Sequence, residues 1–297
     1  MRNKSAENLR TAFFDFAKSN EPSLDDVIGA LTDCPADAIN RILFDLEVWA
    51  RDDQLPPSAA ANGETWRTWL ILGGRGSGKT RAGAEWVRQL VSAGTQKPFA
   101  TPQRIALIGE TLNDVRSVII DGVSGLLAIH PPRDRPRYEA SRNRLIWPNG
   151  AVAQAFTAEN PDGLRGPQFS AAWCDEIAKW RRPDEVWDML QFGLRLGSQP
   201  RTVVTTTPRP VPLLKRLLAD ALTAVTRSRT VDNRANLAAG FIDEMARRYD
   251  GTLLGRQELD GEMIEDASGA LWRRDWIEAA RANAAPELNR IVVAVDQ

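Results

Sequence analysis

The glycine-rich segment GGRGSGKT, Gly73 to Thr80, constrains the fold more than any other part of the sequence. It fits the pattern G-x-x-x-x-G-K-[ST], follows the apolar run TWLILGG and opens the helical pattern TRAGAEWVRQLVSAG. Glycines let a backbone wrap closely around a polyphosphate and turn its N–H groups inward, and a helix N-terminus adds partial positive charge. The strand-loop-helix context therefore favours a phosphate-binding loop over a merely tight turn.

Each polar residue of this loop has an expected task toward ATP and Mg²⁺. Lys79 can reach the β- and γ-phosphates, and the Thr80 hydroxyl can bind Mg²⁺. Arg75 could touch the γ-phosphate in its own subunit or simply face solvent, and Gln54, upstream of the first strand, could hydrogen-bond adenine. The remaining predicted nucleotide-binding positions in the loop are Gly73, Gly74, Gly76, Ser77 and Gly78.

Two adjacent carboxylates, Asp175 and Glu176, end the apolar run SAAWC. A Mg-nucleotide needs a second carboxylate contact from a neighbouring strand end, and Asp175 stands where that contact is expected. Glu176 should point elsewhere and could polarise the attacking water as a general base. A kinase uses its second substrate as nucleophile and has no need of this base. The pair therefore favours hydrolysis over phosphoryl transfer to a metabolite.

Three further features could serve the same chemistry or have no such role. Thr205, Thr206 and Thr207, in TTTPRP, could sense the γ-phosphate at the end of the next strand, or form a Thr-rich strand before a proline turn. Arg165, on a glycine-flanked loop, could reach a neighbouring subunit's nucleotide or be a turn arginine. The arginine-rich run RDRPRYEASRNR could contact DNA phosphates or a neighbouring subunit, although a solvated loop is the simpler interpretation.

Alternating strand and helix patterns predict an α/β fold. Strands rich in Val, Ile and Leu alternate with helices, which indicates a mostly parallel sheet covered on both faces. The predicted strands are TWLILGG, RIALIGE, two strands around the Pro148-Asn149-Gly150 turn, SAAWCDE and RTVVTTTP. The predicted helices after the loop helix are TLNDVRSVIIDGVSGLLAI, PDEVWDMLQFGLRLG and VPLLKRLLADAL, and after residue 232 NLAAGFIDEMARRYDG and LLGRQELDGEM.

Composition excludes several classes of protein. Cys34 and Cys174 are too far apart for a disulfide framework or a zinc pattern, and the single histidine, His130, is expected in a loop. The net charge of −1 excludes a chain that is basic throughout, so any nucleic-acid surface must be local. The sequence lacks an apolar run of membrane-spanning length and a secretion signal, so we expect a cytoplasmic protein with no membrane partner.

Taken together, these segments resemble the large terminase subunit of tailed phages and gene transfer agents. The resemblance rests on WRTWLILGGRGSGKTRAGAEWVR, PDGLRGPQFSAAWCDEIAKW, LRLGSQPRTVVTTTPRP and YDGTLLGRQELDGEM with GALW, in this order. It implies a P-loop ATPase of the additional-strand, catalytic-glutamate class that drives double-stranded DNA through the portal protein into a procapsid. The family acts as a homo-oligomeric ring, commonly a pentamer, with a small terminase subunit.

The resemblance also gives each candidate residue a role. Lys79 and Thr80 would serve the phosphates and Mg²⁺, Asp175 would serve Mg²⁺, and Glu176 the water. Thr205 to Thr207 would form the coupling motif, and Arg165 falls where an arginine acting in trans is expected.

We expect four regions along the chain. Residues 1–52 form a helical N-terminal extension, 53–232 the ATPase core and 233–285 a helical lid or linker. Residues 286–297 would be the first strand of a ribonuclease-H-like nuclease domain, which the family carries after the ATPase. Asp296 would be its first metal ligand, but no further acidic residues of a two-metal site follow, so we expect an ATPase fragment without nuclease activity.

Three other functions remain open at this stage. A helicase or recombinase with the same core would need a second tandem core or filament elements, and the sequence shows neither. A nucleotide-dependent assembly module with little turnover would fit if the chain cannot form its ring. A metabolite kinase is the third, and Glu176 argues against it.

Overall fold

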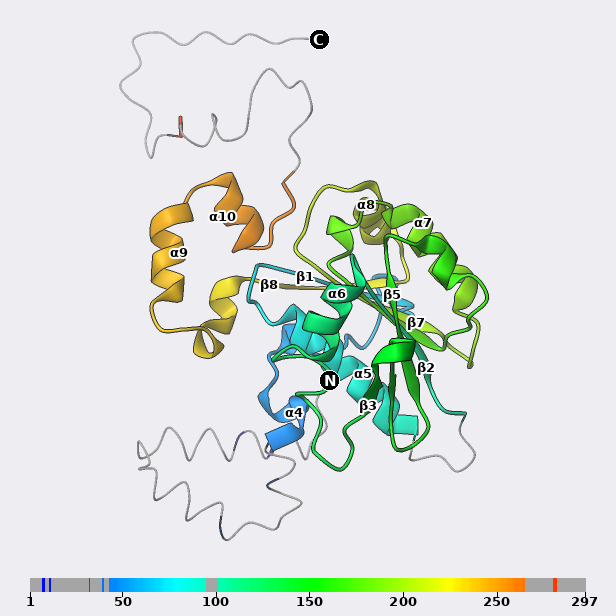
Figure 1. The fold of residues 1–297 in the computed structure, drawn as a ribbon. Helices are drawn as coiled ribbons and strands as arrows, with labels where there is room; N and C mark the ends of the chain where they lie inside the picture. The colour runs from blue at the N-terminus through cyan, green and yellow to red at the C-terminus, as the bar shows by residue number, and fades with distance from the viewer. Residues whose placement is uncertain are drawn as a thin grey trace, which may run out of the picture.

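The computed structural model describes residues 43–94 and 101–264, together with the isolated positions 7, 8, 11, 32, 39, 280 and 281. Its centre is an eight-stranded sheet in the order β3-β4-β5-β2-β6-β7-β1-β8 (Figure 1). Six neighbouring strands run parallel: β5 (Val152–Thr157), β2 (Arg104–Gly109), β6 (Ala171–Asp175), β7 (Arg201–Thr206), β1 (Thr68–Gly73) and β8 (Thr223–Ser228). The predicted mostly parallel sheet is thus confirmed.

The two remaining strands extend one edge in the antiparallel direction. β4 (Arg144–Ile146) pairs with β5 across the predicted Pro148-Asn149-Gly150 turn, and β3 (Arg137–Glu139) pairs with β4. The turn places Gly150 at φ +84°, a left-handed conformation that glycine adopts without steric cost. Neither β3 nor β8 was predicted from the sequence.

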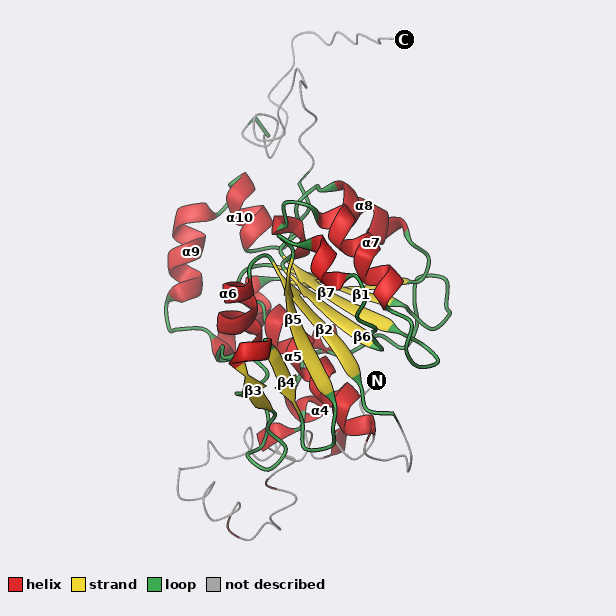
Figure 2. Cartoon of the chain, turned by 45° about the vertical axis from the view of Figure 1, so that its right-hand side comes forward, coloured by secondary structure: helices red, strands yellow, loops and turns green. Residues whose placement is uncertain are grey.

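Two apolar clusters cover the opposite faces of the sheet, because successive side chains of a strand point to opposite sides. Trp69 and Ile71 of β1 pack in one cluster with helix α5 (Lys79–Gly94). Leu70 and Leu72 pack in the other with α7 (Pro183–Gly193) and α8 (Pro212–Ala219). Figure 2 shows these helices on the two sides of the strands. Both faces are therefore buried, as the apolar strands predict.

Short helical turns connect these elements. The predicted helix over residues 111–129 is wrong in its extent: α6 (Leu112–Asp114) passes into a π-helical turn at Val115–Ile120, and residues 121–130 form turns and bends. The 3₁₀ turns lie at Asp52–Gln54, Ala140–Arg142, Pro161–Leu164, Ile177–Lys179 and Thr230–Asn236. Helices α9 (Phe241–Tyr249) and α10 (Leu253–Glu258) lie beyond the β8 edge, as Figure 1 shows.

Several predictions fall outside the described residues. They comprise most of the N-terminal helical extension, of which α4 (Leu46–Trp49) is described, the strand IVVAVDQ with Asp296, and Cys34. Within the described part of the chain, every helix is too short or too polar to span a membrane. His130 lies in a loop, as predicted, but its side chain is only 2 % exposed.

Candidate functional site

A cavity of about 860 Å³ opens where β1 passes into α5. Polar groups on its walls come from the glycine-rich loop, from the segments after β6 and β7, and from the turn before β1. Among the predicted site residues, those that line it are Gln54, Arg75, Gly76, Gly78, Lys79, Thr80, Glu176 and Thr207. The fold therefore gathers predicted residues from separate parts of the sequence around one space.

The loop has the backbone shape that phosphate binding requires. Gly76 and Gly78 have φ values of +75° and +95°, which residues with a side chain rarely adopt. Helix α5 begins at Lys79, so its first-turn amides have no intrahelical partner and stay available to an anion. Gly74 has no space for a side chain, because a Cβ atom there would lie 2.1 Å from the carbonyl oxygen of Leu259.

Lys79 is buried inside the loop. Its Nζ donates hydrogen bonds of 2.9 Å to the carbonyl oxygens of Gly73 and Gly74, and it lies 3.4 Å from Oγ1 of Thr207. Burial lowers the pKa of the ammonium group, and the nearby carboxylates of Glu176 and Asp175 oppose this effect. The ammonium group is thus held at the cavity wall, within a network that joins the loop to the end of β7.

Asp175 ends β6, next to β7. Its Oδ1 accepts a hydrogen bond of 2.6 Å from the Thr205 hydroxyl, and the same hydroxyl accepts one of 2.9 Å from the indole of Trp173. Burial, followed by repulsion from Glu176, raises the pKa of Asp175 to about 6. A buried carboxylate destabilised in this way would gain from a cation beside it.

Glu176 has an unusual backbone conformation. Its φ and ψ are +51° and +45°, in the left-handed region, which is uncommon for a residue with a side chain. This turn lets the side chain leave the strand direction and line the cavity. Its Oε2 accepts a 3.2 Å hydrogen bond from the Thr207 amide and lies 3.7 Å from Nζ of Lys179.

The three threonines after β6 pairs with β7 have distinct contacts. Thr205 binds Asp175, whereas Oγ1 of Thr206 accepts a 3.2 Å hydrogen bond from the Ala178 amide. Thr207 approaches both Lys79 and Glu176. The segment therefore connects the loop to the two carboxylates, as the strand order requires, because β7 lies between β1 and β6.

Arg75 and Gln54 lie at the cavity, but each already has a partner. The guanidinium of Arg75 is 69 % exposed and forms a 3.3 Å ion pair with Glu258. Gln54 is buried, and its Nε2 lies 3.4 Å from the Gly78 carbonyl oxygen. Its Oε1 accepts a 3.2 Å hydrogen bond from the Arg51 amide.

Arg165 lies elsewhere. Its side chain is 69 % exposed, pairs with Asp162 at 2.8 Å and borders a shallow groove with Phe192 and Arg195. This arginine does not line the phosphate-loop cavity of its own chain. In the arginine-rich run, Arg137 and Arg144 pair with Glu139.

Four contacts to the loop had no signal in the sequence. Arg51 donates to the Ser77 carbonyl oxygen at 2.6 Å, and Asn233 donates to that of Gly76 at 2.8 Å. The Thr230 hydroxyl donates to the Arg75 carbonyl oxygen at 2.7 Å, and the Glu258 carbonyl oxygen accepts from the Arg75 amide at 2.6 Å. The last three come from residues far along the chain, so no local pattern could reveal them.

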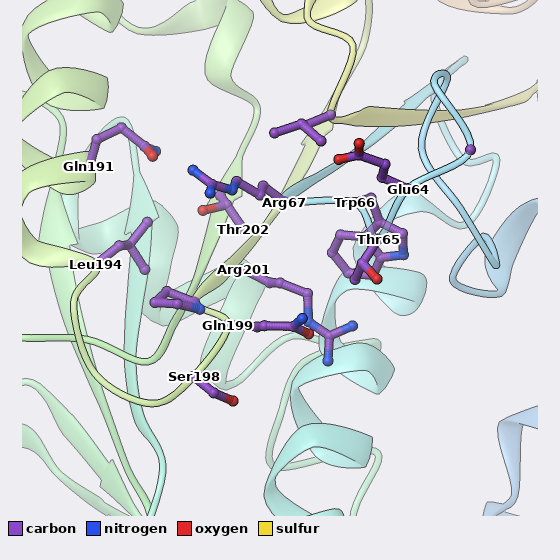
Figure 3. A pocket seen from close by; sticks show the side chains of 13 residues that line it. Glu64, Thr65, Trp66, Arg67, Gln191, Leu194, Ser198, Gln199, Arg201 and Thr202 are labelled. Carbon is purple, nitrogen blue, oxygen red and sulfur yellow. The ribbon is translucent and has the colours of Figure 1, made fainter.

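A second cavity, of about 850 Å³, lies at the opposite edge of the sheet, where β1 and β7 begin (Figure 3). Arg201 lies over the Trp66 ring, 4.8 Å from its centre, and Figure 3 shows both beside Gln199 and Thr65. The walls of this cavity include neither the glycine-rich loop nor paired carboxylates. Phosphate chemistry therefore belongs to the first cavity.

Comparison with known proteins gives one family match. The family model described as "Terminase large subunit, T4likevirus-type, N-terminal" matches residues 70–279. No curated protein matches the chain.

Solved structures of phage proteins share the fold. The large terminase from a thermophilic bacteriophage has a TM-score of 0.55 at 15 % identity, over 66 % of this chain and 48 % of that one. It is also known in complex with ADP and with ATP-gamma-S. The ATPase domain of the Thermus phage P74-26 large terminase has a TM-score of 0.51 at 16 % identity, over 77 % of this chain and 99 % of that one.

The HK97 bacteriophage large terminase gives a TM-score of 0.52 at 17 % identity, over 68 % of this chain and 48 % of that one. This chain therefore spans about half the length of the thermophilic bacteriophage and HK97 proteins and nearly all of the P74-26 domain. At these identities the similarity establishes the P-loop NTPase fold, with β7 as the additional strand between β1 and β6.

Proposed function

The chain belongs to the large-terminase-subunit family, and we propose that it is the ATP-hydrolysing part of a motor that drives double-stranded DNA into a procapsid. One observation carries the proposal: the same cavity presents a phosphate loop with Lys79 and, with it, the carboxylate of Glu176. A module that only binds nucleotide would not need this second group.

The cavity suits a nucleoside triphosphate. The loop amides and Lys79 would bind the phosphates, and Arg75 would reach the γ-phosphate from the exposed side. Gln54 would hydrogen-bond the base. The thermophilic bacteriophage terminase, which shares the fold, is known with ADP and ATP-gamma-S, and this supports the assignment. The apolar lining residues against which a base could pack are Leu46, Trp49, Val123 and Leu237.

The residues present also fit Mg²⁺. Among the described residues, no group of three or more His, Cys, Asp or Glu side chains could hold a metal alone. Thr80 and the buried carboxylate of Asp175 are oxygen donors of the kind that Mg²⁺ accepts beside nucleotide phosphates and water. When bound, Mg²⁺ would neutralise charge on the phosphates. The hydroxyl of Thr205 would keep the Asp175 carboxylate in one orientation.

Glu176 would accept a proton from the attacking water. Its left-handed backbone turns the carboxylate into the cavity, and the Thr207 amide fixes one of its oxygens while leaving the other for water. Proton transfer to a positioned carboxylate contributes about 10²–10⁴-fold to a hydrolytic rate. Because Glu176 and Lys79 both approach Thr207, a change at the phosphates would be transmitted to the segment after β7.

A complete motor would need more than this cavity. We propose a homo-oligomeric ring, a pentamer by analogy with the family, in which Arg165 of one subunit acts on the nucleotide of the next. Its exposure and its separation from its own cavity suit this role. The portal protein and a small terminase subunit would be the further partners, and residues 233–285 would act as the lid.

The steady-state ATPase rate across a protein dilution series tests this function, in the wild-type chain and in Glu176→Gln. We expect turnover per subunit to rise with concentration and to fall at least about 100-fold in the variant, which should still bind Mg-ATP. Comparable turnover in the variant would remove Glu176 as the base. Nucleotide binding without turnover in the wild type, with added portal and DNA, would favour the assembly-module alternative.

A further inference from the structure

The short segment that ends helix α10 lies directly on the glycine-rich loop. The carbonyl oxygens of Glu258 and Leu259 accept hydrogen bonds of 2.6 Å from the Arg75 amide and 2.7 Å from the Thr230 amide. Gly261 touches the same loop, because a Cβ atom there would lie 2.9 Å from the Cα of Gly73. Any movement of the loop would therefore be felt by α10.

Within this contact, one carboxylate serves two arginines. Glu258 is 17 % exposed, and its oxygens lie 3.3 Å from Arg75 and 4.0 Å from Arg209. Arg75 belongs to the loop, and Arg209 follows the threonines after β7. Within residues 43–94 and 101–264, neither arginine has another acidic partner at ion-pair distance.

Both arginines can exchange this partner for another. Their side chains are 69 % and 43 % exposed, so they can move without disturbing the protein interior. Arg75 also lines the cavity, and the Glu258 carboxylate is close enough to Lys79 to affect its pKa. A γ-phosphate arriving in the cavity would compete with Glu258 for the same positive charges.

We propose that Glu258 holds Arg75 and Arg209 until the γ-phosphate of ATP replaces it, so that Glu258 sets how strongly the site discriminates ATP from ADP. This rests on the proposed nucleotide-binding function. ADP lacks the competing phosphoryl group and leaves the ion pairs in place. ATP releases the Glu258 side chain and with it the attachment of α10.

Substitution Glu258→Gln isolates the charge, because glutamine has nearly the same shape and keeps the backbone contact. Partly exposed ion pairs of this kind are weak, so their loss changes an affinity by less than about tenfold. We therefore expect the variant to bind a non-hydrolysable ATP analogue with Mg²⁺ about three- to fivefold more tightly, with ADP affinity unchanged. The matched control is Glu262→Gln, on the same segment, where the carboxylate pairs with Arg256.

Hydrogen exchange gives a second readout that does not depend on any variant. In the wild-type chain, the amides of Leu253–Glu258 should exchange faster with the ATP analogue than with ADP. In the nucleotide-free chain, they should exchange faster in Glu258→Gln than in Glu262→Gln.

The outcomes separate this proposal from the function on which it rests. Equal changes in ATP and ADP affinity, or none, in Glu258→Gln would overturn the role of Glu258 while nucleotide binding stands. A wild-type chain that binds neither nucleotide would instead overturn the proposed function.

Discussion

At the residue scale, each charged side chain of the cavity is held by neighbouring protein groups. Lys79 donates to two loop carbonyl oxygens, the Thr205 hydroxyl donates to Asp175, and the Thr207 amide donates to Glu176. Groups fixed in this way need little rearrangement when a substrate binds, which is how electrostatic preorganisation lowers a barrier.

Substitution of Lys79 should remove nucleotide binding. In Lys79→Ala the phosphates lose the ammonium group, so Mg-ATP should no longer raise the melting temperature. At about 100 times Kd the wild type should gain about 2.7 kcal/mol from the ligand. Thermal melting with and without Mg-ATP measures this. Lys215→Ala, an exposed position on α8, is the control and should keep the full shift. An undiminished shift in Lys79→Ala would contradict the role of the loop.

His130 predicts a pH dependence of stability. It lies 2.6 Å from the Leu126 carbonyl oxygen through Nδ1, and its Nε2 accepts a 2.9 Å hydrogen bond from the Trp147 indole. Burial lowers its pKa from 6.5 to about 4, with Arg88, Asp134 and Arg135 as the charged neighbours. Protonation would break the bond to Trp147.

The sign follows from linkage. Between about pH 6.5 and 4 the unfolded chain binds a proton that the folded chain rejects, so stability present above pH 6.5 is lost as the pH falls toward 4. The loss should reach about 3 kcal/mol. Urea unfolding at several pH values, compared with His130→Gln, isolates this contribution. Parallel pH profiles for the two proteins would contradict it.

At the element scale, the best-predicted parts are those with a long, regular pattern. β1, β2, β6, β7 and α5 were found because their apolar runs are continuous or helically spaced and have clear ends. β8, with the sequence TAVTRS, mixes polar and apolar residues and gains its place only by pairing with β1. The π-helical turn also escaped prediction, because its sequence has the same spacing as an α-helix.

Helix α5 lies unusually close to the sheet at Gly83. A Cβ atom there would lie 2.4 Å from the indole ring of Trp173, which is fully buried and hydrogen-bonded to Thr205. Glycine normally weakens a helix by about 1 kcal/mol relative to alanine, so its presence here reflects packing.

Gly83→Val should therefore destabilise the chain, although valine is the better helix former. Overpacking of this kind costs about 1–3 kcal/mol. Chemical unfolding measures the change. The control is Gln89→Ala, a half-exposed position on the same helix, which should stay within about 0.5 kcal/mol of the wild type. A Gly83→Val chain as stable as the wild type would show that α5 can move away from Trp173.

At the scale of the whole molecule, the cavity is assembled from the ends of the described chain as well as from its centre. Arg51 and Asn233 both bind the loop, and Arg51 also donates to Asn233 at 3.0 Å. The sequence predicted the loop and both carboxylates because each is a local pattern. The contacts from residues 230–261 depend on tertiary folding, so the lid was predicted as a region but not as a partner of the loop.

Arg165 provides the test at this scale, because its proposed partner is a second copy of the chain. Arg165→Ala subunits should bind ATP normally but lower the ATPase activity of mixed assemblies more than in proportion to their fraction. Activity measured across mixing ratios gives this curve. Arg133→Ala, 85 % exposed and outside the groove, should not lower activity. A strictly linear decline with Arg165→Ala would count against a role in trans.

The left-handed backbone of Glu176 has a consequence for how this protein can change over time. A non-glycine residue held there costs about 1–3 kcal/mol, so glycine at position 176 would make the chain more stable. It would also remove the carboxylate that hydrolysis is proposed to need. Selection for stability and selection for turnover therefore oppose each other at this position, and a lineage that lost its need for the motor should drift toward glycine here first.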